Sequence, residues 1–107
     1  MNELVKTLSE NEHPVEVSLR PAKTLDAFKA AVERGYVHVK FTQTRGGTEL
    51  GVRLNRDLSD LKAIDAADDR GRVKLCGDLV LDYEKVRCVA EIDLQTLNGN
   101  GRLELLA

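Results

Sequence analysis

RVKLCGDLVLDYEKVRCVAEIDLQTLNGNGRLELLA, residues 72–107, is the stretch that decides the fold of this chain. Apolar and polar residues alternate along it with the period of two that sends successive side chains to opposite faces of a β-strand. Three such runs in succession predict a three-stranded antiparallel meander, with connections expected at 83–86 and at the Asn-Gly repeat 98–101. One face of the meander then collects Val73, Leu75, Leu79, Leu81, Val86, Cys88, Ala90, Ile92 and Leu94.

The connection at 83–86 also predicts a register. It places Leu75 opposite Leu94 on the apolar face and Val80 opposite Val89 on the other face. A slip by one residue would move the whole apolar set to the wrong side of the sheet, so the identity of the two faces is strongly specified.

Upstream of the meander the pattern changes between helical and strand periods. The expected elements are a short helix over 2–9 with Leu4, Val5 and Leu8, a strand with Val15, Val17 and Leu19 that ends at Pro21, a helix over 24–34, a hairpin formed by 36–42 and 49–55, and a short helix with Leu58, Leu61 and Ile64. The helix over 24–34 has the clearest signals, because Thr24 suits an N-cap and Gly35 suits the C-terminal stop.

The first hairpin carries one apolar and one polar face. A four-residue loop at 44–47 places Val39 opposite Val52 and His38 opposite Arg53. Together the elements predict a single α+β domain over 1–107, a curled antiparallel sheet of about six strands (two hairpins plus the C-terminal meander) packed on one main helix. Such a sheet would either wrap round the helix or form an open barrel.

Composition excludes several classes of function. A net charge of −2 without a basic stretch argues against nucleic-acid binding. No apolar run approaches the roughly 18 residues of a membrane helix, and 1–10 lacks the features of a secretory signal, so we expect a cytoplasmic protein with no membrane partner. His13 and His38 are 25 residues apart and the cysteines have no Cys-x-x-Cys spacing, so no metal or other cofactor is expected.

Two surfaces are candidate interaction sites. The first is the polar face of the first hairpin, represented by Tyr36, His38, Lys40 and Arg53. The alternative for this face is an ordinary solvated sheet surface. Catalysis by His38 is disfavoured because its predicted neighbour is cationic and no carboxylate or nucleophile accompanies it.

The second surface is the outer face of the meander, where four apolar residues project among charged ones: Val80, Val89, Leu97 and Leu106. Either the N-terminal helix or a second protein chain is expected to cover it. An exposed edge along 102–107 is a third place where a partner strand could add to the sheet.

These observations favour a small non-enzymatic protein-interaction or regulatory accessory module that acts through sheet faces or edges. Its partner would be another protein or a second copy of the chain. The alternative is a small-ligand carrier or effector-binding protein with an apolar cavity between the sheet and the main helix, although a filled core is more usual at this size.

Overall fold

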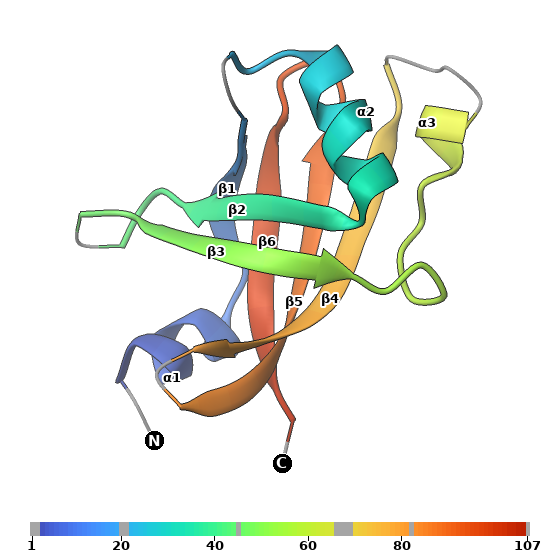
Figure 1. Cartoon of the computed structure of the whole chain (residues 1–107). Coiled ribbons are helices and arrows are strands. Elements are labelled where there is room, and N and C mark those ends of the chain that lie inside the picture. Colours follow the sequence, from blue (N-terminus) through green and yellow to red (C-terminus); the bar gives the residue numbers. More distant parts are fainter. Residues whose placement is uncertain (1–2, 20–21, 45, 66–69, 82, 107) are drawn as a thin grey trace.

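The computed structural model describes residues 3–19, 22–44, 46–65, 70–81 and 83–106. These residues form, in order, α1 (Glu3–Glu10), β1 (His13–Ser18), α2 (Leu25–Arg34), β2 (Tyr36–Phe41), β3 (Thr48–Leu54), α3 (Lys62–Asp65), β4 (Arg72–Leu81), β5 (Glu84–Asp93) and β6 (Asn98–Leu105). Each strand pairs antiparallel with the next, and β6 returns to β1, so the sheet is a closed barrel (Figure 1). The predicted antiparallel pairing and mixed α and β content are confirmed.

Closure of the sheet shows that the predicted open, curled sheet packed on one main helix is wrong. β1 pairs with β6 from His13, opposite Gly101, to Glu16, opposite Asn98. The last strand is therefore not a free edge over its first half. Closure requires two segments at opposite ends of the chain to pair, and the local alternation of apolar residues does not encode such a pairing. It joins the two edge strands along residues 13–16 and 98–101, whereas residues 102–105, part of the edge expected over 102–107, have no partner in β1.

The predicted faces are correct for the residues within strands, whereas Leu97, expected on the outer face, lies in a turn and is buried in the core; the predicted registers are wrong. Leu75 pairs with Ala90, not with Leu94, because β4 and β5 are joined through a two-residue connection between Leu81 and Glu84. The displacement is four residues, and an even displacement leaves every side chain on its own face.

The registers of the other two hairpins also differ from the predicted ones by an even number of residues. Val39 pairs with Leu50 in place of Val52. The turn before β6 lies at 94–97, where Leu97 has a φ of 60°, so Gly99 lies within the strand instead of in a turn.

Two helices lie near opposite ends of the barrel (Figure 1). α2 has the predicted caps, since the Thr24 hydroxyl accepts a hydrogen bond from the Ala27 amide and Gly35 has a φ of 79°. α1 packs against β6, and its Val5 and Leu8 are buried in the same cluster as the inward-facing strand residues. The N-terminal helix therefore contributes to the barrel core and is not a cover for the outer face of the meander. The side chain of Leu4, and Pro21, lie outside the described residues.

The contact between β3 and β4 is the shortest in the barrel. Only Arg53 with Asp78 and Leu54 with Gly77 are paired. A Cβ atom at Gly77 would lie 2.1 Å from the Arg53 carbonyl oxygen, so glycine is needed for the two backbones to approach this closely.

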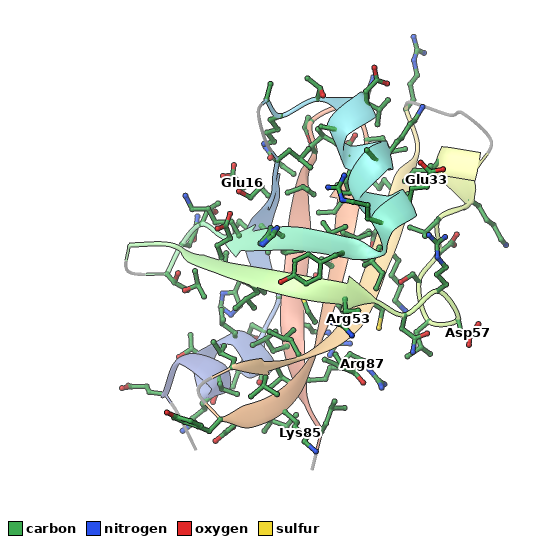
Figure 2. The ribbon with its side chains drawn as sticks, in the orientation of Figure 1. Glu16, Glu33, Arg53, Asp57, Lys85 and Arg87 are labelled. Atoms are coloured by element: carbon green, nitrogen blue, oxygen red, sulfur yellow. The ribbon has the colours of Figure 1, made fainter. Side chains whose placement is uncertain are left out.

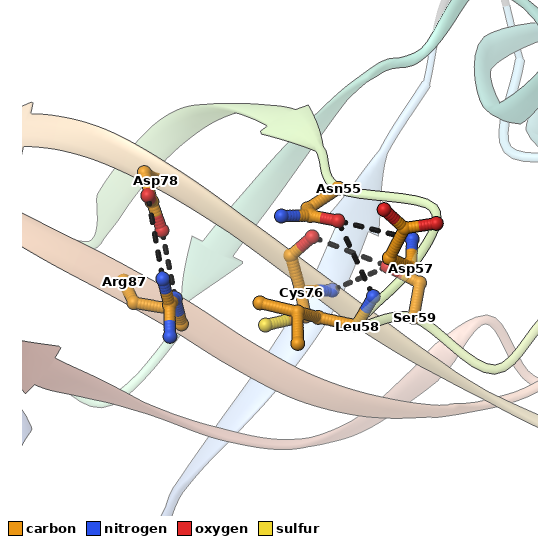
Figure 3. Close-up of polar contacts among 7 residues, drawn as sticks. All are labelled: Asn55, Asp57, Leu58, Ser59, Cys76, Asp78 and Arg87. Atoms are coloured by element: carbon orange, nitrogen blue, oxygen red, sulfur yellow. Dashed lines mark hydrogen bonds and ion pairs between the residues drawn. The ribbon is translucent and has the colours of Figure 1, made fainter.

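The loop after β3 continues along β4 where pairing between the strands ends (Figure 3). The Asn55 amide donates to the Cys76 carbonyl at 2.7 Å, and Asp60 and Lys74 exchange two backbone hydrogen bonds of 2.9 Å. Between them, the Ser59 hydroxyl accepts from the Cys76 amide at 3.0 Å and donates to its carbonyl at 3.2 Å. We call residues 55–60 the latch loop. Because these residues bond to β4, the helix expected to start near Leu58 is only the four-residue α3.

Candidate functional site

A groove of about 350 Å³ lies between α2 and the outer surface of the neighbouring strands. Figure 1 shows α2 standing over the start of β2, which it joins through Gly35. The groove is lined by Ser18, Leu19, Ala27, Ala30, Ala31, Arg34, Tyr36, His38 and Glu49. It therefore combines residues of one helix and three strands or their ends.

The helical wall of the groove consists of small side chains and one cation. Ala27, Ala30, Ala31 and Arg34 are spaced so that they share one face of a helix. The adjacent face holds Phe28 and the rest of the core-facing side of α2, which anchors the helix to the barrel. The alanines leave open a space that longer side chains would fill.

The sheet wall is formed mainly by Tyr36 and His38, which point outward from β2. Their rings meet edge to face, with centroids 5.1 Å apart and planes at 87°. His38 pairs with Ser18 on one side and Gly51 on the other. A Cβ atom at Gly51 would lie 1.9 Å from the Tyr36 hydroxyl, so the tyrosine ring lies over the glycine. An aromatic ring over a strand glycine covers backbone that the glycine leaves open.

Several polar side chains in the groove have unused hydrogen-bonding capacity. Among the described residues, the side chains of Ser18, Arg34 and His38 make no hydrogen bond or ion pair, and the Tyr36 hydroxyl makes none either. The groove thus presents a guanidinium group, two hydroxyl groups and an imidazole to whatever occupies it. Such a set can bind and orient a polar ligand.

The other two predicted residues of this hairpin face do not line the groove. Lys40 lies between Glu16 on β1 and Glu49 on β3, its partners in the two registers, and is half-buried. Arg53 pairs with Tyr36, not with His38 as predicted, and it lies at the contact with β4. The structure therefore brings Tyr36 and His38 into one site and leaves Lys40 and Arg53 beside it.

The four residues of the second predicted surface do not form one apolar patch. Val80 is 63% exposed and pairs with Lys85, whereas Val89 is half-buried and pairs with Cys76. Leu97 is buried in the core, and Leu106 is half-buried, with its amide bonded to the Lys85 carbonyl.

A row of charged residues separates Val80 from Val89 on the outer face. Asp78 pairs with Arg87, which pairs with Glu104 on β6. The Arg87 Nε atom lies 2.8 Å from the Asp78 carboxylate (Figure 3). The four-residue change in register is what inserts this row, so the continuous apolar surface expected from the sequence is not present.

The two cysteines lie on opposite faces of the barrel wall, and both are free thiols. Cys88 faces the core, where burial raises the pKa of its thiol to about 12. Cys76, whose backbone is bonded to the latch loop, pairs with Val89 on the other face of β4, and burial also raises the pKa of its thiol. Raised pKa values disfavour the thiolate, so neither residue has the character of a reactive cysteine.

The groove contains no arrangement typical of acid–base catalysis. His38 has no carboxylate partner among the described residues that would orient its ring. In the same part of the chain no three His, Cys, Asp or Glu residues are grouped so as to hold a metal ion.

Sequence reasoning found the sheet wall of the groove and missed the helical wall. Ser18 and Arg34 were not among the expected site residues, and neither were the alanines of α2, whereas Glu49 belongs to the polar hairpin face that was expected. The spacing of 27, 30, 31 and 34 is visible in the sequence, but only the position of α2 over β2 shows that this face borders a groove.

None of the helices in the described residues has the length and apolar character needed to cross a membrane. No protein-family model matches the chain, and no curated protein is significantly similar to it in sequence.

Proposed function

We propose that this chain is a small non-enzymatic interaction module, with a regulatory or accessory role, that binds a protein partner in the groove between α2 and β2. The observation that supports the proposal is the convergence on one groove of Ser18, Arg34 and His38, whose side chains have no polar partner among the described residues. Protein interfaces commonly satisfy such groups with hydrogen bonds from the partner, around an apolar centre. A cytoplasmic location fits this role, because both cysteines are free thiols and disulfides are rare in the cytosol.

Site-specific photo-crosslinking tests the proposal. A benzoylphenylalanine replaces Tyr36 in the groove, or Tyr83, which is 100% exposed at the β4–β5 connection and serves as the matched control. Each protein is irradiated in an extract of its own cells. We expect a crosslinked protein of defined mass from position 36 that is missing from position 83. A crosslinked mass of twice the chain would identify the partner as a second copy.

A groove-filling variant provides the second arm of the test. Ala27→Gln with Ala30→Gln extends two side chains into the groove, whereas Lys29→Gln with Glu33→Gln changes the same helix outside the lining. Neither double variant changes the net charge, and glutamine is a good helix former. Loss of the crosslink only in the first double variant supports the proposal. Equal crosslinking in both would show that the groove is not the binding site.

A small-ligand carrier or effector-binding protein is the second candidate, because the groove volume of about 350 Å³ falls within the usual range for ligand sites, about 300–1,000 Å³. The buried apolar residues form a single cluster inside the barrel, so a ligand would use the same groove and not a cavity in the core. A ligand at 100 times its Kd should stabilise the fold by about 2.7 kcal/mol in a thermal-shift screen. The double variant Ala27→Gln, Ala30→Gln should lose that effect.

A further inference from the structure

We infer that the occupant of the groove is an extended acidic peptide segment, in which a carboxylate side chain pairs with Arg34 and a neighbouring apolar side chain packs on the α2 alanines. This inference rests on the proposed function and specifies the chemistry of the partner. It follows from three properties of the groove: a cation on α2 without a partner among the described residues, a small apolar surface beside it on the same helix, and hydroxyl and imidazole groups on the strands.

Arg34 is the cation in the lining of the groove. It lies in the last turn of α2, it is exposed, and it makes no ion pair or hydrogen bond with any described residue. A guanidinium group presents donors in a fork that matches the two oxygens of a carboxylate. Glu49, the acidic residue of the lining, already interacts with another part of the chain. A carboxylate at Arg34 would thus gain a strong partner.

The sheet wall fits the backbone of an extended segment. The Tyr36 and Ser18 hydroxyl groups can each donate and accept a hydrogen bond, and the neutral His38 ring has one donor and one acceptor nitrogen. Peptide N–H and C=O groups need such mixed partners when they leave water. The edge-to-face packing of Tyr36 on His38 and its position over Gly51 hold these groups in place before binding, which reduces the entropy lost on association.

The alanine side chains of α2 determine which kind of partner side chain can lie beside Arg34. Ala31 is buried, whereas Ala27 and Ala30 are half-buried and border the open space. An apolar side chain from the partner would complete the burial of these two residues. A nucleic acid does not suit the groove, because nucleic-acid affinity comes from several phosphate contacts and the lining offers one arginine.

A random nine-residue peptide library displayed on phage is the probe for this inference. The library is selected on the immobilised wild-type chain, and the recovered peptides are sequenced. We expect enrichment of Asp or Glu next to an apolar residue. Selection without acidic enrichment, or no selection at all, would overturn the inference.

Charge variants then test Arg34 directly with one selected peptide. Arg34→Glu should weaken its binding about 10- to 100-fold, the loss typical of a charged hydrogen-bonded pair, and Arg34→Gln should weaken it less. Lys85→Glu makes the same change in net charge far from α2, toward the other end of the barrel (Figure 2), and should leave the affinity within about twofold. Thermal unfolding of each variant verifies that the fold is retained. Equal affinities of the Arg34→Glu and Lys85→Glu proteins would refute the role of Arg34.

The outcomes separate this inference from the proposed function. A peptide that binds the wild type without acidic preference, and that the double variant Ala27→Gln, Ala30→Gln rejects, leaves the groove as a protein-binding site and removes only the acidic specificity. A peptide that both proteins bind equally well contradicts the inference and the proposed site together.

Discussion

Ser59→Ala should destabilise the barrel measurably, because the Ser59 hydroxyl takes the place of a missing strand partner at Cys76. Pairing between β3 and β4 covers two residues only, and beyond it the Cys76 amide donates to the Ser59 oxygen at 3.0 Å. The Cys76 residue is only 3% exposed, so water does not readily replace the lost acceptor. The Cys76 carbonyl keeps its hydrogen bond from the Asn55 amide at 2.7 Å. The variant therefore leaves one buried donor without a partner.

The expected loss follows from that single donor. A buried backbone N–H without an acceptor costs about 1–3 kcal/mol, so we expect the free energy of unfolding to fall by about 2 kcal/mol. For a chain of this length, that loss corresponds to a decrease in Tm of roughly 8 °C. Urea unfolding monitored by circular dichroism gives the first quantity, and a thermal melt gives the second.

Labelling of Cys76 supplies an independent measurement of the latch loop. Cys76 is buried and its backbone is bonded to the latch loop, so we expect opening of the loop to expose its thiol; weakening the loop by about 2 kcal/mol should then accelerate labelling about 30-fold. Mass spectrometry of the digested protein separates Cys76 from Cys88. Ser9→Ala is the matched control, because the Ser9 hydroxyl donates to the Val5 carbonyl within α1. Removing that bond should change the stability by less than about 0.5 kcal/mol.

If Ser59→Ala unfolds within about 0.5 kcal/mol of the wild type and its Cys76 is labelled no faster, the latch loop does not replace β3 along β4. A stability loss without faster labelling would mean that Ser59 matters but that the loop does not control access to the thiol.

Three further predictions concern the core and the barrel wall. Gly77→Ala places a Cβ atom 2.1 Å from the Arg53 carbonyl oxygen and should lower the free energy of unfolding by about 3 kcal/mol or prevent folding. Gly46→Ala is the control, because Gly46 has open space around it and a φ of 75°, and it should lower the free energy of unfolding by about 1 kcal/mol in the same urea assay. Leu8→Ala should cost about 2–5 kcal/mol, because Leu8 is fully buried against the barrel interior, and a loss below about 1 kcal/mol would show that α1 is not part of the core. Burial raises the pKa of Cys88 from 9.0 to about 12, so the folded state retains a proton that the unfolded state loses above pH 9. The free energy of unfolding of the wild type should therefore fall as the pH rises through that range, and that of Cys88→Ala should fall less. Equal pH dependence of the two proteins would contradict the raised pKa of Cys88.

The sequence determined which face each strand residue occupies, and it did not determine the registers. Faces depend on a period of two, and every error was an even number of residues. The register of β4 and β5 depended on the connection, where the chain turns directly between Leu81 and Glu84 and Tyr83 adopts a φ of 70°. Positive φ at a tyrosine is uncommon, so the residue type gave no signal for such a tight connection.

The closed barrel and the groove could not be predicted from the sequence either. Both depend on contacts between elements that are distant in sequence, namely β1 with β6 and the outer face of α2 with β2. Tyr36 and His38 were found because they alternate along one strand. Arg34 was not found, because a cation in the last turn of a helix has an ordinary role at the helix terminus and needs no binding site to explain it.

The pairing of the first strand with the sixth has a consequence for how this chain folds. During synthesis, β1 leaves the ribosome early, but its partner β6 is made only after all the other strands. Until then β1 has one open side, and the row of peptide groups there can pair with other chains. Contacts of such long sequence separation also slow the search for the native topology. The nascent chain should therefore depend on chaperones or on rapid synthesis more than a helical protein of equal length does.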